Sequence, residues 1–293
     1  MMPSPFALEA LAKAYRAAVE PVDVIVSSVA ALLCSAPDRI HEVLILRTDA
    51  EVIDKKPDGS SAYGFRWKPG KGAAPMIKWI TSTMASVARE AFQRVRGATE
   101  EARQVARWYE VHPAQMYLPD HLQHLRTRQF ITVGEAKDAL FVTGMGNVLD
   151  FCERKKVKCE GVGQDAMIDF ETFEAAVIGL LPDGFPMMEP ITGLLYSEAL
   201  CVSRRNEFHA TRGTYRCAIE RIDDGKIATG LGNNSEHGKG SIFDRLGFFE
   251  EDGSPIAIRS HQFRHYLNTL AKDGGLNEFE IAKWSGRADI SQN

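Results

Sequence analysis

The sequence lacks any apolar run long enough to span a lipid bilayer, and this absence argues against a membrane-spanning chain. The best candidate, residues 22–34, is too short and contains Asp23. The N-terminus has no basic segment followed by an apolar block, so we expect no secretory signal. Cysteine is scarce, with five in 293 residues, and no two of them form a C-x-x-C pair. These features predict a cytoplasmic protein with reduced thiols, no disulfide framework and no zinc site.

A sequence-wide excess of positive charge is also missing, since the formal net charge is −4. This value excludes a uniformly basic surface, but it permits local basic stretches that could bind nucleic acid. Each such stretch could equally be an ordinary solvated face. Three stretches stand out: Lys68, Lys71 and Lys78; Arg154, Lys155, Lys156 and Lys158; and Arg204, Arg205, Arg212 and Arg216.

The apolar periodicity predicts a largely helical first third of the chain. Residues 7–34 should form two helices broken at Pro21, and a further helix should begin near Pro37. Residues 62–80 are typical of two short strands around a Pro/Gly/Ala turn, and helix should follow from 81 to about 109. Residues 182–259 are rich in Gly, Asp and Asn, which predicts loops and short helices.

The block from Phe130 to Lys158 has the length and rhythm of a helix-turn-helix. Its pattern predicts helices over 133–140 and 147–154 with a turn near Gly144. It resembles the excisionase-type and MerR-type units whose second helix enters a major groove, although a plain packing unit is the alternative. The basic residues after the second helix, Arg154, Lys155 and Lys156, are the candidate DNA contacts. The expected core of the block is Val133, Ala136, Leu140, Val148, Leu149 and Phe151.

A helix that should run from Ser260 to Gly274-Gly275 carries the most distinctive polar residues. His261 and Arg264 are three residues apart, so they share one face of the helix. Two groups that bind anions on one rigid element suggest a site for phosphate or carboxylate, and chance charges on a surface helix are the alternative. The expected buried stripe behind them is Phe263, Leu267, Leu270 and Ala271.

The residues that follow place this helix in a recognisable order of motifs. The sequence reads "HQFRH", a glycine pair, a second helix over about 277–284, and then "WSGR". This order resembles the C-terminal half of the catalytic domain of tyrosine recombinases, the phage integrase family. That family shows H-x-x-R-H, helix, glycine, helix and "LGH". By this resemblance His261, Arg264 and His265 match the first motif, and Arg287 takes a position that is commonly His or Trp.

The resemblance implies a second arginine upstream, and two stretches compete for it. "TGLLYSEALCV" has Leu195 where the arginine should be, whereas "APDRIHEVLIL" has Arg39 with Glu42 three residues later. The second stretch also precedes the predicted hairpin, as in the family, so Arg39 is the preferred residue. The hairpin lysine is then Lys71, with Lys68 as the alternative.

The resemblance covers about residues 22–96 and 240–293, and it implies an α+β, mainly helical fold with a small sheet. The N-terminal part of the catalytic domain would be residues 1–110, a large helical insertion 111–240, and the C-terminal part 241–293. In the family a nucleophilic tyrosine follows a few residues after the position of Asn293, and none of the seven tyrosines present has that position. The alternative to an incomplete recombinase domain is therefore a non-catalytic DNA-binding protein.

The resemblance also assigns roles, and the chemistry explains the residue types. Arg39 and Arg264 would clamp the scissile phosphate, because arginine offers paired donors that remain charged. His261 and Arg287 would hydrogen-bond to the same phosphate, and Lys71 would protonate the leaving 5′ oxygen. His265 would support the site and Glu42 would orient its neighbours. We expect no metal and no cofactor, double-stranded DNA as the partner, a possible homo-oligomer on DNA, and no membrane association.

Overall fold

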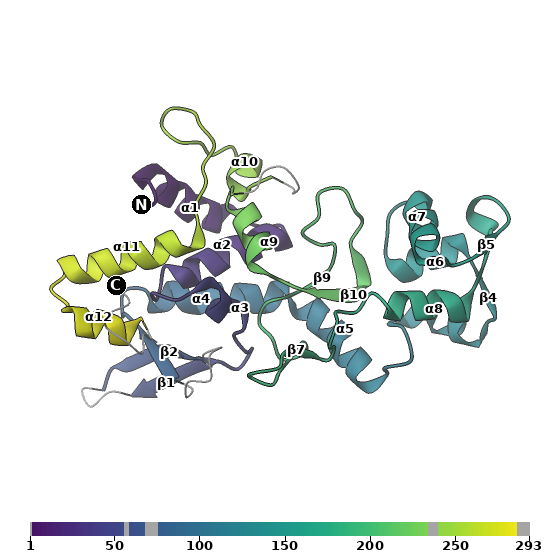
Figure 1. Cartoon of the computed structure of the whole chain (residues 1–293), viewed down its shortest axis with the longest axis horizontal. Helices are drawn as coiled ribbons and strands as arrows, with labels where there is room; N and C mark the ends of the chain where they lie inside the picture. Colours follow the sequence, from purple (N-terminus) through teal and green to yellow (C-terminus); the bar gives the residue numbers. More distant parts are fainter. Residues whose placement is uncertain (1, 56–58, 68–75, 234–239, 286–293) are drawn as a thin grey trace.

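The computed structural model describes residues 2–55, 59–67, 76–233 and 240–285 (Figure 1). Within these residues the protein is mixed α/β and mainly helical, with small antiparallel sheets. The predicted fold class is confirmed at this level. Among the described helices, none has the length and apolarity needed to cross a membrane.

Twelve α-helices are present in the described parts of the chain, and several begin with the residues that favour a helix start. Ser4 caps the first helix by accepting a hydrogen bond from the Ala7 amide at 2.9 Å, and Pro21 starts the second, which confirms the predicted break. The helices are α1 (Pro5–Ala17), α2 (Pro21–Leu33), α3 (Ile40–Leu44), α4 (Ala85–Ala98), α5 (Glu100–Val111), α6 (Val133–Leu140), α7 (Met145–Lys155), α8 (Phe170–Ile178), α9 (Asp224–Gly230), α10 (Ile242–Leu246), α11 (Ser260–Asp273) and α12 (Glu278–Trp284).

The strands form four small antiparallel sheets. Two 3-10 segments are also present: η1 (Asp120–Thr127) precedes β4, and η2 (Gly163–Asp165) connects β5 to β6. The first sheet has the order β1-β2-β3, from β1 (Glu51–Lys55), β2 (Ser61–Trp67) and β3 (Met76–Ile80). The second has the order β4-β6-β5, from β4 (Phe130–Thr132), β5 (Cys159–Glu160) and β6 (Met167–Asp169). The other two pair β7 (Met187–Glu189) with β8 (Leu194–Leu195), and β9 (Val202–Arg205) with β10 (Tyr215–Arg221).

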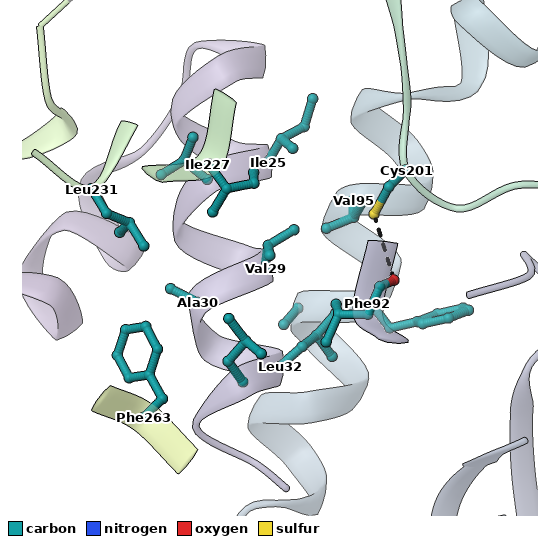
Figure 2. Close-up of a cluster of buried hydrophobic side chains, with 14 of the residues drawn as sticks. Ile25, Val29, Ala30, Leu32, Phe92, Val95, Cys201, Ile227, Leu231 and Phe263 are labelled. Carbon is teal, nitrogen blue, oxygen red and sulfur yellow. Dashed lines mark hydrogen bonds between the residues drawn. The ribbon is translucent and has the colours of Figure 1, made fainter. Parts of the chain in front are cut away.

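The largest core is built around α2, which is buried on most of its circumference. Figure 2 shows α2 between Phe92 and Val95 of α4 on one side and Ile227 of α9 on the other, with Phe263 of α11 near its C-terminal half. Residues from both ends of the chain therefore share one core. This shared core explains how α11 can approach α3 although more than 200 residues separate them.

A second, separate core lies under the predicted helix-turn-helix block. It joins α6, α7 and α8 to β10 and to the segment around η1. Val133, Ala136, Leu140, Val148 and Phe151 are buried there as expected. Leu149 was expected in this core and is instead 44% exposed, because it lies on the outward face of α7.

Two other sequence predictions are wrong, the one for residues 182–259 and the one for the buried stripe of α11. The region 182–259 contains four strands in addition to short helices, and β1 is a strand that the sequence did not indicate. The buried stripe of α11 is reduced to Phe263, since Leu267 and Ala271 are only partly buried and Leu270 is 48% exposed. The stretch around Leu195, which was set aside in favour of Arg39, forms β8 and a turn rather than a helix.

Candidate phosphate-binding site

Arg39 stands directly before α3, with its side chain partly open to solvent. Its backbone amide donates to Glu42 Oε2 at 3.1 Å and its Nη1 donates to Glu42 Oε1 at 3.3 Å. The Arg39 side chain nevertheless remains 44% exposed. Glu42 therefore holds the guanidinium while leaving part of it accessible to an anion, and its orienting role at a phosphate site stays a prediction.

Beneath Arg39 lies a buried ion cluster of Lys78, Asp38 and Glu42. Lys78 Nζ donates to Asp38 Oδ1 at 2.5 Å and to Glu42 Oε2 at 3.0 Å, and it lies 4.8 Å from the centre of the Trp67 ring. The side chains of Lys78 and Asp38 are only 3% and 1% exposed. A lysine on β3 thus connects the sheet to the segment that carries Arg39.

The two carboxylates of this cluster differ in their pKa values because their surroundings differ. Burial raises the pKa of Asp38 to about 6, although Lys78 and the more distant Arg264 both favour its ionised form. Burial also opposes ionisation of Glu42, but Lys78 and the Arg39 amide outweigh it and lower its pKa. Glu42 is therefore the firmly ionised member, and Asp38 titrates closer to neutral pH.

Arg264 ties α11 to the residues just before Arg39. Its Nη1 donates to the carbonyl oxygen of Pro37 at 2.7 Å, and its Nη2 donates to the carbonyl oxygen of Ser285 at 3.3 Å. Ser285 is buried and its hydroxyl bonds to Asn268 Oδ1 at 3.1 Å, which joins the end of α12 to α11. The "HQFRH" helix and the Arg39 segment, distant in sequence, are therefore in direct contact.

The two histidines of α11 lie on its exposed side. Both His261 and His265 are exposed, and their rings are 5.9 Å apart in a T-shaped arrangement. A neutral or protonated imidazole at these positions can donate a hydrogen bond to an anion that approaches from solvent. The remaining site residues expected from the sequence, Lys71, Lys68 and Arg287, lie outside the described residues.

The structure thus brings the Arg39 segment, Glu42 and Arg264 together, with His261 and His265 on the adjoining helix. That Arg39 and Arg264 converge on one phosphate stays a prediction. The sequence reading missed the buried cluster, because it grouped Lys78 with Lys68 and Lys71 as one basic surface stretch. The alternation of side chains along β3 could have revealed this cluster. Lys78 lies on the same buried face of the strand as Ile80, whereas Ile77 and Trp79 lie on the exposed face.

The helix-turn-helix block is far from this site. The structure confirms the helix 133–140 and a second helix, expected over 147–154 and found at 145–155, with a turn between them, followed by the strands β5 and β6. Figure 1 shows α7 and α11 toward opposite ends of the longest axis of the molecule. The outward face of α7 includes Asp150 and Glu153, and these carboxylates would repel a phosphate backbone. Arg154, Lys155 and Lys156 are exposed at the C-terminal end of the helix.

Comparisons with known proteins return no match to a family model, a curated protein or a solved structure. The resemblance to tyrosine recombinases therefore rests on the order and spacing of the sequence motifs. In the described residues there is also no group of three or more His, Cys, Asp or Glu side chains arranged to hold a metal ion.

Proposed function

We propose that this chain binds duplex DNA and positions a scissile phosphate in the manner of a tyrosine-recombinase catalytic domain. The observation that carries the proposal is the 2.7 Å hydrogen bond from Arg264 to the carbonyl oxygen of Pro37. It joins the two arginine-bearing motifs, which the family resemblance requires to be neighbours and which lie 227 residues apart at this contact.

The residue types suit the chemistry of phosphodiester attack. Negative charge grows on the non-bridging oxygens of a phosphodiester when a hydroxyl attacks it, and fixed cations lower the barrier by meeting that charge. Arg39 supplies exposed donors that Glu42 holds in place, and Arg264 adds a half-buried charge at the same segment. His261 and His265 would add hydrogen bonds from the exposed side of α11. In this proposal Lys71 remains the general acid and Arg287 a further phosphate contact.

A non-catalytic DNA-binding protein is the second candidate. The observation that favours it is the block of α6, a turn, α7 and the β5–β6 pair, which has its own core. A helix-turn-helix can hold DNA without any reaction. In that case the Arg39 and Arg264 site would bind the DNA backbone without activating it.

The proposal is tested by measuring the affinity of the chain for a labelled 30-base-pair duplex by fluorescence anisotropy over a series of salt concentrations. The plot of log K against log salt should be steep, because each phosphate contact contributes about 0.9 to the slope. Arg39→Gln should weaken binding and flatten the slope by about one such contact. Arg39 is suited to this test because its side chain is 44% exposed and belongs to no hydrophobic core, so its replacement should leave the fold intact.

Lys272→Gln is the matched control, since it removes one exposed positive charge from the C-terminal end of α11. It should leave the slope unchanged. Equal effects of the two substitutions would show only diffuse attraction between the protein and DNA. No measurable binding by the unmodified chain at low salt would refute the DNA-binding function altogether.

A further inference from the structure

Two basic stretches that are separate in sequence meet in one small pocket beside the helix-turn-helix block. The pocket has a volume of about 110 Å³ and lies between the C-terminal end of α7, the segment after α8, and the β9–β10 hairpin. Its wall has four positively charged side chains and no acidic one. The residues that line it are Phe151, Arg154, Lys155, Leu180, Arg205, Asn206, Arg212 and Tyr215.

Three of the four cations are held by neutral groups. Arg154 Nη2 donates to the Tyr215 hydroxyl at 3.2 Å, and Lys155 Nζ donates to the Gly179 carbonyl oxygen at 3.5 Å. Arg205 Nη1 donates to the Leu180 carbonyl oxygen at 3.0 Å. The bonds of Arg154 and Arg205 orient these side chains without cancelling their charges, and the longer contact of Lys155 is weaker.

These four cations also have no direct ion-pair partner in the part of the chain that the structure describes. Across the described ranges, no carboxylate lies within 4.0 Å of the charged nitrogens of Arg154, Lys155, Arg205 or Arg212. Arg204, the neighbour of Arg205, shows the contrast, because it pairs with both Glu101 and Glu207. Like charges that are held close together without counterions repel one another, and an anion that enters the pocket relieves this repulsion.

Two of these positive charges, those of Arg154 and Arg212, both influence the hydroxyl of Tyr215. Burial raises the pKa of Tyr215, while Arg154 and Arg212 both act to lower it. The two arginines come from different elements, α7 and the loop between β9 and β10, so their convergence is a property of the fold. Arginine donors suit phosphate because the planar guanidinium can pair with two oxygens at once.

We propose that this pocket binds one phosphate group through Arg154, Lys155, Arg205 and Arg212, and that the phosphate belongs to the backbone of duplex DNA. The choice of DNA rests on the proposed function, whereas the phosphate chemistry follows from the pocket itself. A free phosphate is the other possible source. A larger cavity of about 370 Å³, whose wall also includes Glu220 and Asp223, adjoins the pocket and shares Arg205, Asn206 and Arg212 with it.

The test uses Lys155→Gln combined with Arg212→Gln, two exposed side chains of the pocket. The matched control combines Lys156→Gln with Arg216→Gln. Lys156 is the sequence neighbour of Lys155, and Arg216 is an exposed residue of β10. Neither lines the pocket. Both double variants lose two positive charges from the same two regions. Neither touches the Arg39 and Arg264 site, so DNA binding through that site persists in both.

The first measurement is the shift in melting temperature caused by inorganic phosphate, relative to chloride at equal ionic strength. A ligand that binds only the folded state raises the melting temperature. We expect phosphate to stabilise the unmodified chain and the control variant, and we expect the pocket variant to lose this increment. If all three proteins respond alike, or none responds, the pocket does not bind phosphate and the proposal is overturned.

The second measurement is the salt dependence of binding to the labelled duplex. The pocket variant should show a slope flatter by about one phosphate contact, about 0.9, while the control variant keeps its slope. If the pocket variant loses the phosphate-induced rise in melting temperature but keeps the slope of log K against log salt, the pocket binds phosphate, and the phosphate does not belong to DNA. If phosphate changes the melting temperatures as expected but none of the proteins binds DNA, the phosphate pocket stands and the proposed DNA-binding function is refuted.

Discussion

The buried cluster of Lys78, Asp38 and Glu42 beneath Arg39 lets us predict a large loss of stability for Lys78→Met. Methionine keeps most of the length of the lysine side chain but removes its ammonium group, which leaves Asp38 and Glu42 without their shared cation. Removing one partner of a buried ion pair destabilises a protein by about 3–5 kcal/mol, because the remaining charge is uncompensated. With Asp38 1% exposed and Glu42 11% exposed, we expect a loss in this range at pH 7.5.

The pH dependence of that loss separates a charge effect from a packing effect. Asp38 already has a pKa raised to about 6 in the folded protein, and removal of Lys78 should raise it further. The unfolded state takes up this proton only near the ordinary pKa of about 3.9, so lowering the pH from 7.5 to 5 stabilises both folded proteins. The variant gains more, because its more strongly raised Asp38 pKa lets it bind the proton over a larger part of this range. The difference in unfolding free energy between the variant and the unmodified chain should therefore shrink at pH 5.

Urea denaturation followed by circular dichroism measures this difference at both pH values. Lys55→Met serves as the control, because Lys55 lies exposed on β1 of the same sheet, and its effect should be within about 0.5 kcal/mol. A loss of less than about 1 kcal/mol for Lys78→Met would refute the reasoning from buried charge. A loss that is equal at pH 5 and pH 7.5 would assign the effect to packing alone.

Three further outcomes follow from the structure. Asp38→Asn removes the titrating group. The free energy of unfolding of the unmodified chain should therefore fall relative to that of the variant as the pH rises from about 4 to about 6. Urea denaturation at several pH values measures this, and parallel pH profiles of the two proteins would contradict the raised pKa. Phe263→Ala should cost about 3–5 kcal/mol because the ring is fully buried, whereas Leu270→Ala, on the exposed side of the same helix, should cost much less in the same assay. Burial raises the pKa of Cys201 and of Cys217 to about 12, so a thiol reagent should modify them only on unfolding; rapid labelling of either in the native protein would contradict their burial.

The sequence predicted the elements whose signals are local. Proline at a helix start, the paired glycines after α11 and the helical spacing of apolar residues depend only on neighbouring positions, and they gave α1, α2, α6 and α11 nearly to the residue. The strands β9 and β10 were missed for a physical reason. Their pairing shifts register between Tyr215 and Ile219, so the simple alternation that identifies a strand is interrupted. The strand β1 is short and rich in charge, and it is formed by pairing with β2.

Only those residues of the candidate site that belong to a sequence motif could be predicted. Arg39, Glu42 and Arg264 were chosen by order and spacing, and the structure brings their segments into contact. Lys78 and Asp38 carry no motif, because their role depends on a β-strand register that places a lysine between two carboxylates. The pocket of Arg154, Lys155, Arg205 and Arg212 likewise needs the packing of α7 against the β9–β10 hairpin, which no local pattern reveals.

The most direct test of the central claim is a double-mutant cycle on DNA binding with Arg39→Gln, Arg264→Lys and the two combined. Residues that hold one phosphate together show coupled effects, whereas distant and independent residues give additive ones. If Arg39 and Arg264 clamp the same phosphate, the combined variant should lose clearly less affinity than the sum of the single losses, with a coupling energy of about 0.5–3 kcal/mol. Strictly additive losses in affinity for the duplex, or no loss in either single variant, would contradict the account.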